Sequence, residues 1–178
     1  MIDAIVALVA VLAGILAGWA IARRRRHVRV AGRVSRILLP FTGSISRRAL
    51  DAALRLARAE DATLMPAFLA TVPRHLPLDA AVPLQCELGM PLLEAIEQAA
   101  ARSDVPVDAR VVRGRTYRHA LELLLAEERV DRVVVSATGN PRSGLTNDDL
   151  VWLLQRAPAE VVILRPDFAD RLSVTGVH

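Results

Sequence analysis

The sequence predicts an α/β fold, an open and doubly wound parallel sheet of five strands preceded by one transmembrane helix. Short apolar runs alternate with amphipathic segments of helical period from residue 36 to residue 166, as in successive βαβ units. Within them, Asp131–Pro166 contains a buried strand, a glycine-bearing loop, a short helix and a second buried strand. Before them, Ala4–Ala22 is an apolar run of 19 residues without a charge.

The apolar run near the N-terminus predicts a retained membrane anchor. As a helix, Ala4–Ala22 would reach roughly 29 Å, close to the hydrocarbon thickness of a bilayer. Trp19 lies near its end, where an aromatic ring suits the interface. The alternative is a cleaved signal peptide, but that requires basic residues before the apolar run, and here they follow it. We therefore expect a single-pass protein of the cell membrane.

The basic residues indicate which side of the membrane the domain occupies. All 23 are arginines, and seven of them lie in residues 23–36. Residues 37–178 hold 16 arginines against 18 acidic residues, so the domain lacks the basic stripe of a nucleic-acid-binding protein. Arg23–Arg26 predict a cytoplasmic C-terminal domain and a contact with anionic lipid headgroups. The predicted parts are a transmembrane helix (1–22), an arginine-rich linker (23–35), the α/β domain (36–166) and a loose tail (167–178).

Each element of the domain has its own signal. The expected strands are Ile37–Phe41, Thr63–Val72, Pro106–Val112, Arg132–Ala137 and Val161–Leu164. The expected helices are about Arg47–Glu60, Leu92–Arg102, Thr116–Glu128, and a short one from Thr146 or Asn147 to Arg156. Ser46 or Ser44 caps the first helix, which places Leu50, Ala53, Leu54 and Ala57 on one face. Four prolines in and just after residues 73–90 predict an extended connection there.

This order of elements resembles the universal stress protein family over about Arg36–Pro166. The resemblance rests on ILLPFTGSISRRALDAALRLA at the first strand and helix, VDARVVRGRTYRHALELLLAE in the middle, and RVVVSATGNPRSGL with QRAPAEVVILRP at the end. It implies a nucleotide-binding-type α/β fold and a homodimer paired through the last strand, Val161–Leu164. The family includes ATP-binding and non-binding branches. A membrane anchor is not its usual arrangement.

The loop after the fourth strand departs from the ATP-binding branch. That branch has a Gly-x-x-Gly-x9-Gly-Ser/Thr pattern, whose glycines let backbone amides approach the phosphates. Aligned on Arg142–Leu145, this chain has Thr138 and Pro141 at the first two glycine positions. The next helix begins early, and Asp148 and Asp149 in its first turn would repel a triphosphate. The resemblance therefore implies weak or absent ATP binding.

The turn after the first strand departs as well. ATP-binding relatives usually have an Asp where this chain has Thr42. The remaining candidate nucleotide-binding residues are Thr42, Gly43, Ser44, Gly139, Arg142, Ser143 and Gly144. They could form a small anion site, or the glycines could serve only to make the turns. No cofactor is expected, and ATP is a doubtful one.

The sequence offers no catalytic or metal-binding constellation. Ser44 is not within a Gly-x-Ser-x-Gly elbow, and no two histidines have the spacing of a zinc site. His75 and Cys86 fall in the proline-rich connection, where we expect a solvent-exposed loop, and His119 is expected on a helix surface. The hypothesis is a non-enzymatic stress-response or signalling interaction module. The alternative is a nucleotide-sensing protein that uses the residual glycine loops.

Overall fold

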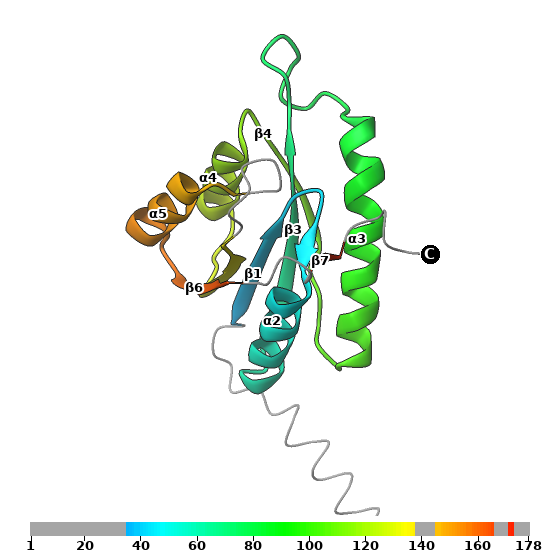
Figure 1. Ribbon diagram of the computed structural model, residues 1–178, viewed down its shortest axis with the longest axis vertical. Helices are drawn as coiled ribbons and strands as arrows, with labels where there is room; N and C mark the ends of the chain where they lie inside the picture. Colours follow the sequence, from blue (N-terminus) through cyan, green and yellow to red (C-terminus); the bar gives the residue numbers. More distant parts are fainter. Residues whose placement is uncertain (1–34, 138–144, 166–170, 173–178) are drawn as a thin grey trace, which may run out of the picture. The chain divides into compact units, whose positions relative to one another are not determined.

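Five parallel strands form the central sheet in the computed structural model, which describes residues 35–137, 145–165 and 171–172 (Figure 1). The strands lie in the order β4-β3-β1-β5-β6. They are β1 (Arg36–Phe41), β3 (Thr63–Thr71), β4 (Arg110–Gly114), β5 (Arg132–Ser136) and β6 (Glu160–Leu164). The predicted five-stranded parallel sheet is confirmed, with β4 and β6 as its edges.

The strand order reverses direction next to β1. From β1 the chain moves outward to β3 and β4, then returns to the other side of β1 for β5 and β6. In open α/β sheets, such a reversal leaves a crevice outside the carboxyl ends of the strands, and ligands bind there. The topology therefore directs attention to the segments that follow β1, β3 and β5.

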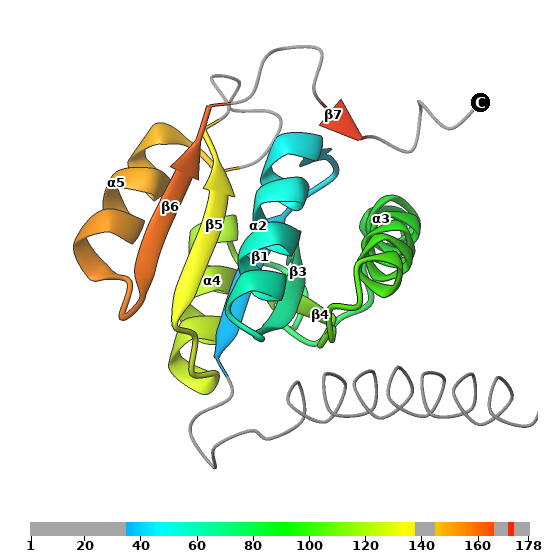
Figure 2. The same cartoon turned by 90° about the horizontal axis from the view of Figure 1, so that it is seen from below.

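Helices cover both faces of the sheet (Figure 2). They are α2 (Arg47–Ala59), α3 (Pro83–Arg102), α4 (Tyr117–Glu127) and α5 (Asn147–Arg156). One buried cluster joins α2 and α3 to the sheet, and a second joins α4 and α5 to its other face. The sheet is thus buried on both sides, which agrees with the nearly continuous apolar runs of its inner strands.

The first helix begins as the sequence predicts. Ser46 is the N-cap of α2, and its hydroxyl accepts a hydrogen bond from the Ala49 amide at 3.2 Å. The predicted apolar positions of this helix are all buried, namely Leu50, Ala53, Leu54 and Ala57. Ser46 therefore sets the start of the helix, and the turn between β1 and α2 is short.

The prediction for the segment before Leu92 was wrong. Residues 83–90 are helical, because α3 runs without interruption from Pro83 to Arg102 and contains Pro91 in its interior. A proline suits the first turn, so Pro83 is a favourable start. An interior proline destabilises a helix by about 3 kcal/mol. Burial of the apolar face of α3 against the sheet offsets this cost. The buried residues after Pro91 are Leu92, Leu93, Ile96 and Ala100.

Two further boundaries differ from the sequence prediction. The third sheet strand begins at Arg110 rather than Pro106, with Val107 only bridging to Leu64 beforehand. The tail was expected to be loose, but Arg171–Leu172 forms β7, which pairs antiparallel with β2 (Ile45–Ser46). A two-residue pairing carries no periodic signal, so the pattern of the tail could not reveal it.

Ion pairs gather at the amino ends of the strands. Arg36 and Arg110 both contact Glu128, which follows α4. Arg132, at the start of β5, contacts Glu160 and Glu60, and these two carboxylates raise the pKa of its guanidinium above the ordinary value. The charged side chains thus lie at the edge of the sheet opposite to the carboxyl ends of the strands.

The predicted membrane anchor, Ala4–Ala22, and the arginine-rich linker lie outside the described residues. In the part of the chain that the structure does describe, no helix combines the length and the hydropathy needed to cross a bilayer.

Candidate functional site

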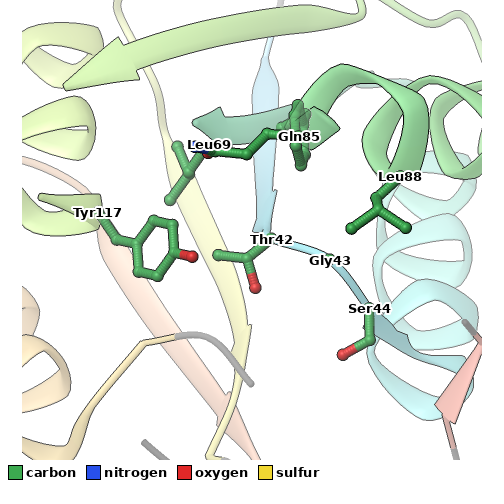
Figure 3. Close-up of a pocket in the computed structure, with 8 residues that line it drawn as sticks. Thr42, Gly43, Ser44, Leu69, Gln85, Leu88 and Tyr117 are labelled. Carbon is green, nitrogen blue, oxygen red and sulfur yellow. The ribbon is translucent and has the colours of Figure 1, made fainter. Parts of the chain in front are cut away.

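A pocket lies at the carboxyl ends of β1 and β3, beside the reversal in strand order. Its volume is about 280 Å³. Its lining comes from the turn after β1, the end of β3 and the starts of α3 and α4, and consists of Thr42, Gly43, Ser44, Phe68, Leu69, Gln85, Leu88 and Tyr117. Tyr117 and Leu88 lie on opposite sides of the Thr42–Gly43 segment (Figure 3). The pocket is thus where a doubly wound sheet places a ligand site.

The structure brings together part of the predicted site. Thr42, Gly43 and Ser44 all line the pocket. Thr42 is only 4 % exposed, so its side chain belongs to the floor rather than the rim. The other predicted residues lie outside the described residues, namely Gly139, Arg142, Ser143 and Gly144. The glycine loop after β5 therefore stays a prediction, whereas the turn after β1 has a definite place.

Aromatic and aliphatic side chains that the sequence reasoning missed form the pocket walls. Phe68 packs beside Phe41 with ring centroids 5.7 Å apart. The ring of Phe68 also meets Gly89 of α3, where any Cβ would lie 2.5 Å from three ring carbons. Leu69 points to the opposite face of the sheet and joins the cluster under α4. The carboxyl ends of parallel strands lie at a common edge of the sheet. The end of the predicted strand Thr63–Val72 could therefore have indicated that Phe68 and Leu69 lie beside the turn after β1.

Gln85 connects the start of α3 to the end of β3. Its side-chain oxygen accepts a hydrogen bond from the Thr71 amide at 2.7 Å, and its nitrogen donates to the Thr71 carbonyl at 2.7 Å. The side chain crosses from α3 toward β3 in Figure 3. No sequence signal could identify this contact, because the expected start of the helix at Leu92 placed Gln85 in an extended connection.

The described lining of the pocket is uncharged. Three of its side chains are apolar, one is a tyrosine with a polar hydroxyl, and the others are a threonine, a serine and a glutamine. A triphosphate is normally held by several backbone amides together with a lysine, an arginine or a metal ion. Among the described residues, the lining therefore offers no charged side chain to a phosphate group.

The N-terminus of α5 is occupied by a side chain of the helix itself. Thr146 is the N-cap, one of the two predicted starts, and its hydroxyl accepts a hydrogen bond from the Asp149 amide. The Asp149 carboxylate in turn accepts from the Thr146 amide and hydroxyl, both at 2.8 Å. This capping box satisfies donors that an anion would otherwise use. Asp148 adds a second negative charge in the same turn.

The remaining candidate residues do not form a reactive cluster. His75 is exposed in the connection after β3, as expected. Cys86 is not in a loop, because it lies within α3, half-buried against the core. His119 is half-buried on α4, and its Nδ1 accepts a hydrogen bond from the Arg115 amide at 3.1 Å. Among the described residues, no group of three or more metal-binding side chains could hold an ion.

The fold and the pocket define a doubly wound α/β domain with a pocket at its reversal in strand order. The family model described as the universal stress protein family matches residues 33–165. The chain therefore belongs to the universal stress protein family. No curated protein matches the sequence.

Solved structures share this fold at low sequence identity. A universal stress protein family member from Burkholderia pseudomallei is 24 % identical, with a TM-score of 0.56 over 75 % of this chain and 97 % of that one. A universal stress protein in complex with cAMP is 20 % identical, with a TM-score of 0.57 over 75 % and 98 %. A family protein from Arabidopsis thaliana with AMP bound is 14 % identical, with a TM-score of 0.55 over 76 % and 94 %.

Proposed function

We propose that this member of the family is a membrane-anchored, non-enzymatic stress-response or signalling module that acts through an interaction and binds ATP weakly or not at all. The observation that supports it most is the uncharged described lining of the pocket. The capping box of Thr146 and Asp149 supports it further. The Asp149 carboxylate already lies at the N-terminus of α5, where its negative charge would repel a phosphate group.

Titration of the purified full-length protein with ATP, with and without Mg²⁺, tests the nucleotide part of this proposal. We expect a dissociation constant weaker than about 1 mM, which corresponds to about −4 kcal/mol. A micromolar affinity would overturn it. Release of phosphate from ATP in the same samples, compared with buffer alone, tests the non-enzymatic part, and turnover above the buffer rate would contradict it.

The membrane anchoring in this proposal is based on the apolar run Ala4–Ala22 and on the arginines Arg23–Arg26. Each arginine near an anionic membrane surface contributes about 1 kcal/mol to the free energy of membrane binding. We expect the full chain to stay with the membrane fraction after a carbonate wash, and a chain lacking residues 1–35 to be released. Protease added outside intact cells should leave the C-terminal domain uncut. Release of the full chain by carbonate, or removal of the domain by external protease, would contradict the anchor or its orientation.

The proposed partner includes a second copy of this chain. β6 is an edge strand, so its outer backbone groups have no neighbouring strand within the described sheet. Exposed apolar side chains lie close by in sequence, at Ile163 on β6 and at Val151 and Leu154 on α5. Pairing of two β6 strands about a two-fold axis would cover them.

A nucleotide sensor is the second candidate function. Thr42, Gly43 and Ser44 line the pocket, and relatives of the same fold are described in complex with cAMP and with AMP. Thermal unfolding of the full-length protein with AMP, cAMP, ADP and ATP tests it. A ligand at 100 times its dissociation constant adds about 2.7 kcal/mol to stability, so a true ligand raises the melting temperature by several degrees. Unchanged melting with all four would remove this candidate.

A further inference from the structure

Strand β3 continues past the end of its neighbour β1. The last paired residues of the two strands are Phe41 and Phe68, whereas β3 extends to Thr71, which pairs with Gly114 of β4. The next amide, that of Val72, donates to the Gly114 carbonyl on the β4 side. Because successive residues of a strand direct their backbone groups to alternate sides, the N–H and C=O of Thr71 point to the side that β1 has left.

The side chain of Gln85 forms the hydrogen bonds with Thr71 that a continuation of β1 would have formed. Its carboxamide forms two hydrogen bonds of 2.7 Å with the amide and the carbonyl of Thr71. The assignment of oxygen and nitrogen follows from the partners, since the Thr71 N–H needs an acceptor and its carbonyl needs a donor. A single side chain thus completes a backbone pair at the end of the sheet.

The Gln85 side chain lines the pocket, whereas Thr71 is not among the lining residues, so the carboxamide covers this backbone pair on the pocket side. A flat ligand with an adjacent donor and acceptor, such as the amidine edge of a purine, needs a backbone pair of this kind. The carboxamide of Gln85 presents the same pattern of donor and acceptor. It would therefore compete for Thr71 with any such ligand.

We propose that Gln85 is the specificity-determining residue of the pocket, because its carboxamide occupies the Thr71 backbone pair and excludes ligands that require an amide or amidine edge to be read there. Such a ligand binds only if it displaces Gln85 from the end of β3. This inference rests on the proposed weak nucleotide binding and assigns part of its cause to one side chain.

The test compares two purines in the full-length protein. Both bases carry a methyl group on N9, which removes the N9–H donor beside the N3 acceptor. Adenine then has an N–H donor beside a ring acceptor only at its 6-amino group, whereas 6-dimethylaminopurine keeps the ring but has lost that donor. In Gln85→Ala the Thr71 pair is free, and we expect adenine to bind at least about tenfold more tightly than in the unsubstituted protein. The affinity for 6-dimethylaminopurine should not rise in this way. Gln98→Ala is the matched control, because Gln98 is exposed on the same helix.

Equal affinity for adenine in Gln85→Ala and the unsubstituted protein would overturn the inference, as would an equal gain for both purines. Such results would leave the proposed weak ATP binding intact, whereas tight ATP binding by the unsubstituted protein would overturn that proposal separately.

A second variant gives a readout that needs no ligand. Gln85→Met keeps a long unbranched side chain on α3 but cannot form the amide pair. We expect the Thr71 amide to exchange its hydrogen at least tenfold faster in this variant, with little change at the Val72 amide, which still donates to Gly114. Thr71 exchange as slow as in the unsubstituted protein would overturn the inference.

Discussion

Single residues set how closely α3 approaches the sheet. Gly89 lies where the helix meets the Phe68 ring, and the space for a Cβ is taken by ring carbons. Phe68 is itself held by Phe41 and lines the pocket. The absence of a side chain at residue 89 therefore determines both the packing of the helix and the position of one pocket wall.

Gly89→Ala should destabilise the domain even though alanine is the better helix former. Overpacking costs about 1–3 kcal/mol, and the gain in helix propensity returns up to about 1 kcal/mol. We expect a lower midpoint of chemical unfolding and a net loss of up to about 2 kcal/mol in the free energy of unfolding. Gly43→Ala is the control, because nothing lies within 4 Å of its added Cβ. A Gly89→Ala protein as stable as Gly43→Ala would contradict this account.

Arg115 holds the connection between β3 and α3. Its guanidinium donates to the carbonyls of Pro73 at 2.6 Å and Leu76 at 2.8 Å. Arg115→Ala should loosen this connection by about 1–3 kcal/mol, seen as faster hydrogen exchange at the Leu76 amide. Arg74→Ala changes the same charge at an exposed position nearby and should leave exchange unchanged. Equal exchange in the two variants would refute the role of Arg115.

The residues of the site could be predicted only where a local pattern points to them. The turn after β1 follows a recognisable strand, so Thr42, Gly43 and Ser44 were identified, and the structure places them in the pocket. Gln85 was not, because its role depends on a helix start and on a strand end 14 residues earlier in the chain. Contacts of that kind follow from tertiary packing and have no periodic signature.

Among the helices, the N-cap residues could be predicted from the sequence, whereas a proline inside a helix could not. Ser46 caps α2 as expected, and Thr116 caps α4 at the residue where that helix was expected to begin, because a hydroxyl before an amphipathic run is a local signal. Pro91 misled the prediction for α3, since a proline inside a helix is normally a boundary. Burial of the apolar face of the helix outweighs it, and that burial depends on the sheet.

The capping box of α5 carries a prediction for that element. Asp149→Ala removes the acceptor for the Thr146 amide and hydroxyl, so we expect a loss of about 0.5–2 kcal/mol in the free energy of unfolding. Asp148→Ala removes the same charge from the same turn at an exposed position, and its effect on the helix dipole is about 0.3–1 kcal/mol. Chemical unfolding of both variants measures the difference. If the two lose the same amount, the hydrogen bonds of the box contribute nothing.

For the whole molecule, the parallel topology followed from the alternation of strands and helices. Right-handed crossovers and helices on both faces leave few strand orders open, and the observed order is one of them. The added pair β2 and β7 escaped prediction because each strand is only two residues long. The oligomeric state depends on exposed residues, and the hydrophobic periodicity of the sequence identifies only the residues of the core.

Self-association should depend on one edge of the sheet and not on the other. Ile163 on β6 and Val111 on β4 are 37 % and 38 % exposed, so a charge at either position has a similar cost for folding. We expect Ile163→Glu to be monomeric at concentrations where the unsubstituted protein is a dimer, and Val111→Glu to remain dimeric. Sedimentation equilibrium of the full-length proteins measures both. A dimeric Ile163→Glu protein would rule out pairing through β6.

The two ends of the sheet carry different kinds of interaction. Ion pairs of Arg36, Arg110 and Arg132 gather where the strands begin, whereas the pocket, whose described lining is uncharged, lies where β1 and β3 end. Substitutions around the pocket therefore leave the charged end untouched, and residues that far apart act almost additively on stability. Single substitutions can therefore alter the lining of the pocket without disturbing the ion pairs that stabilise the opposite end of the sheet.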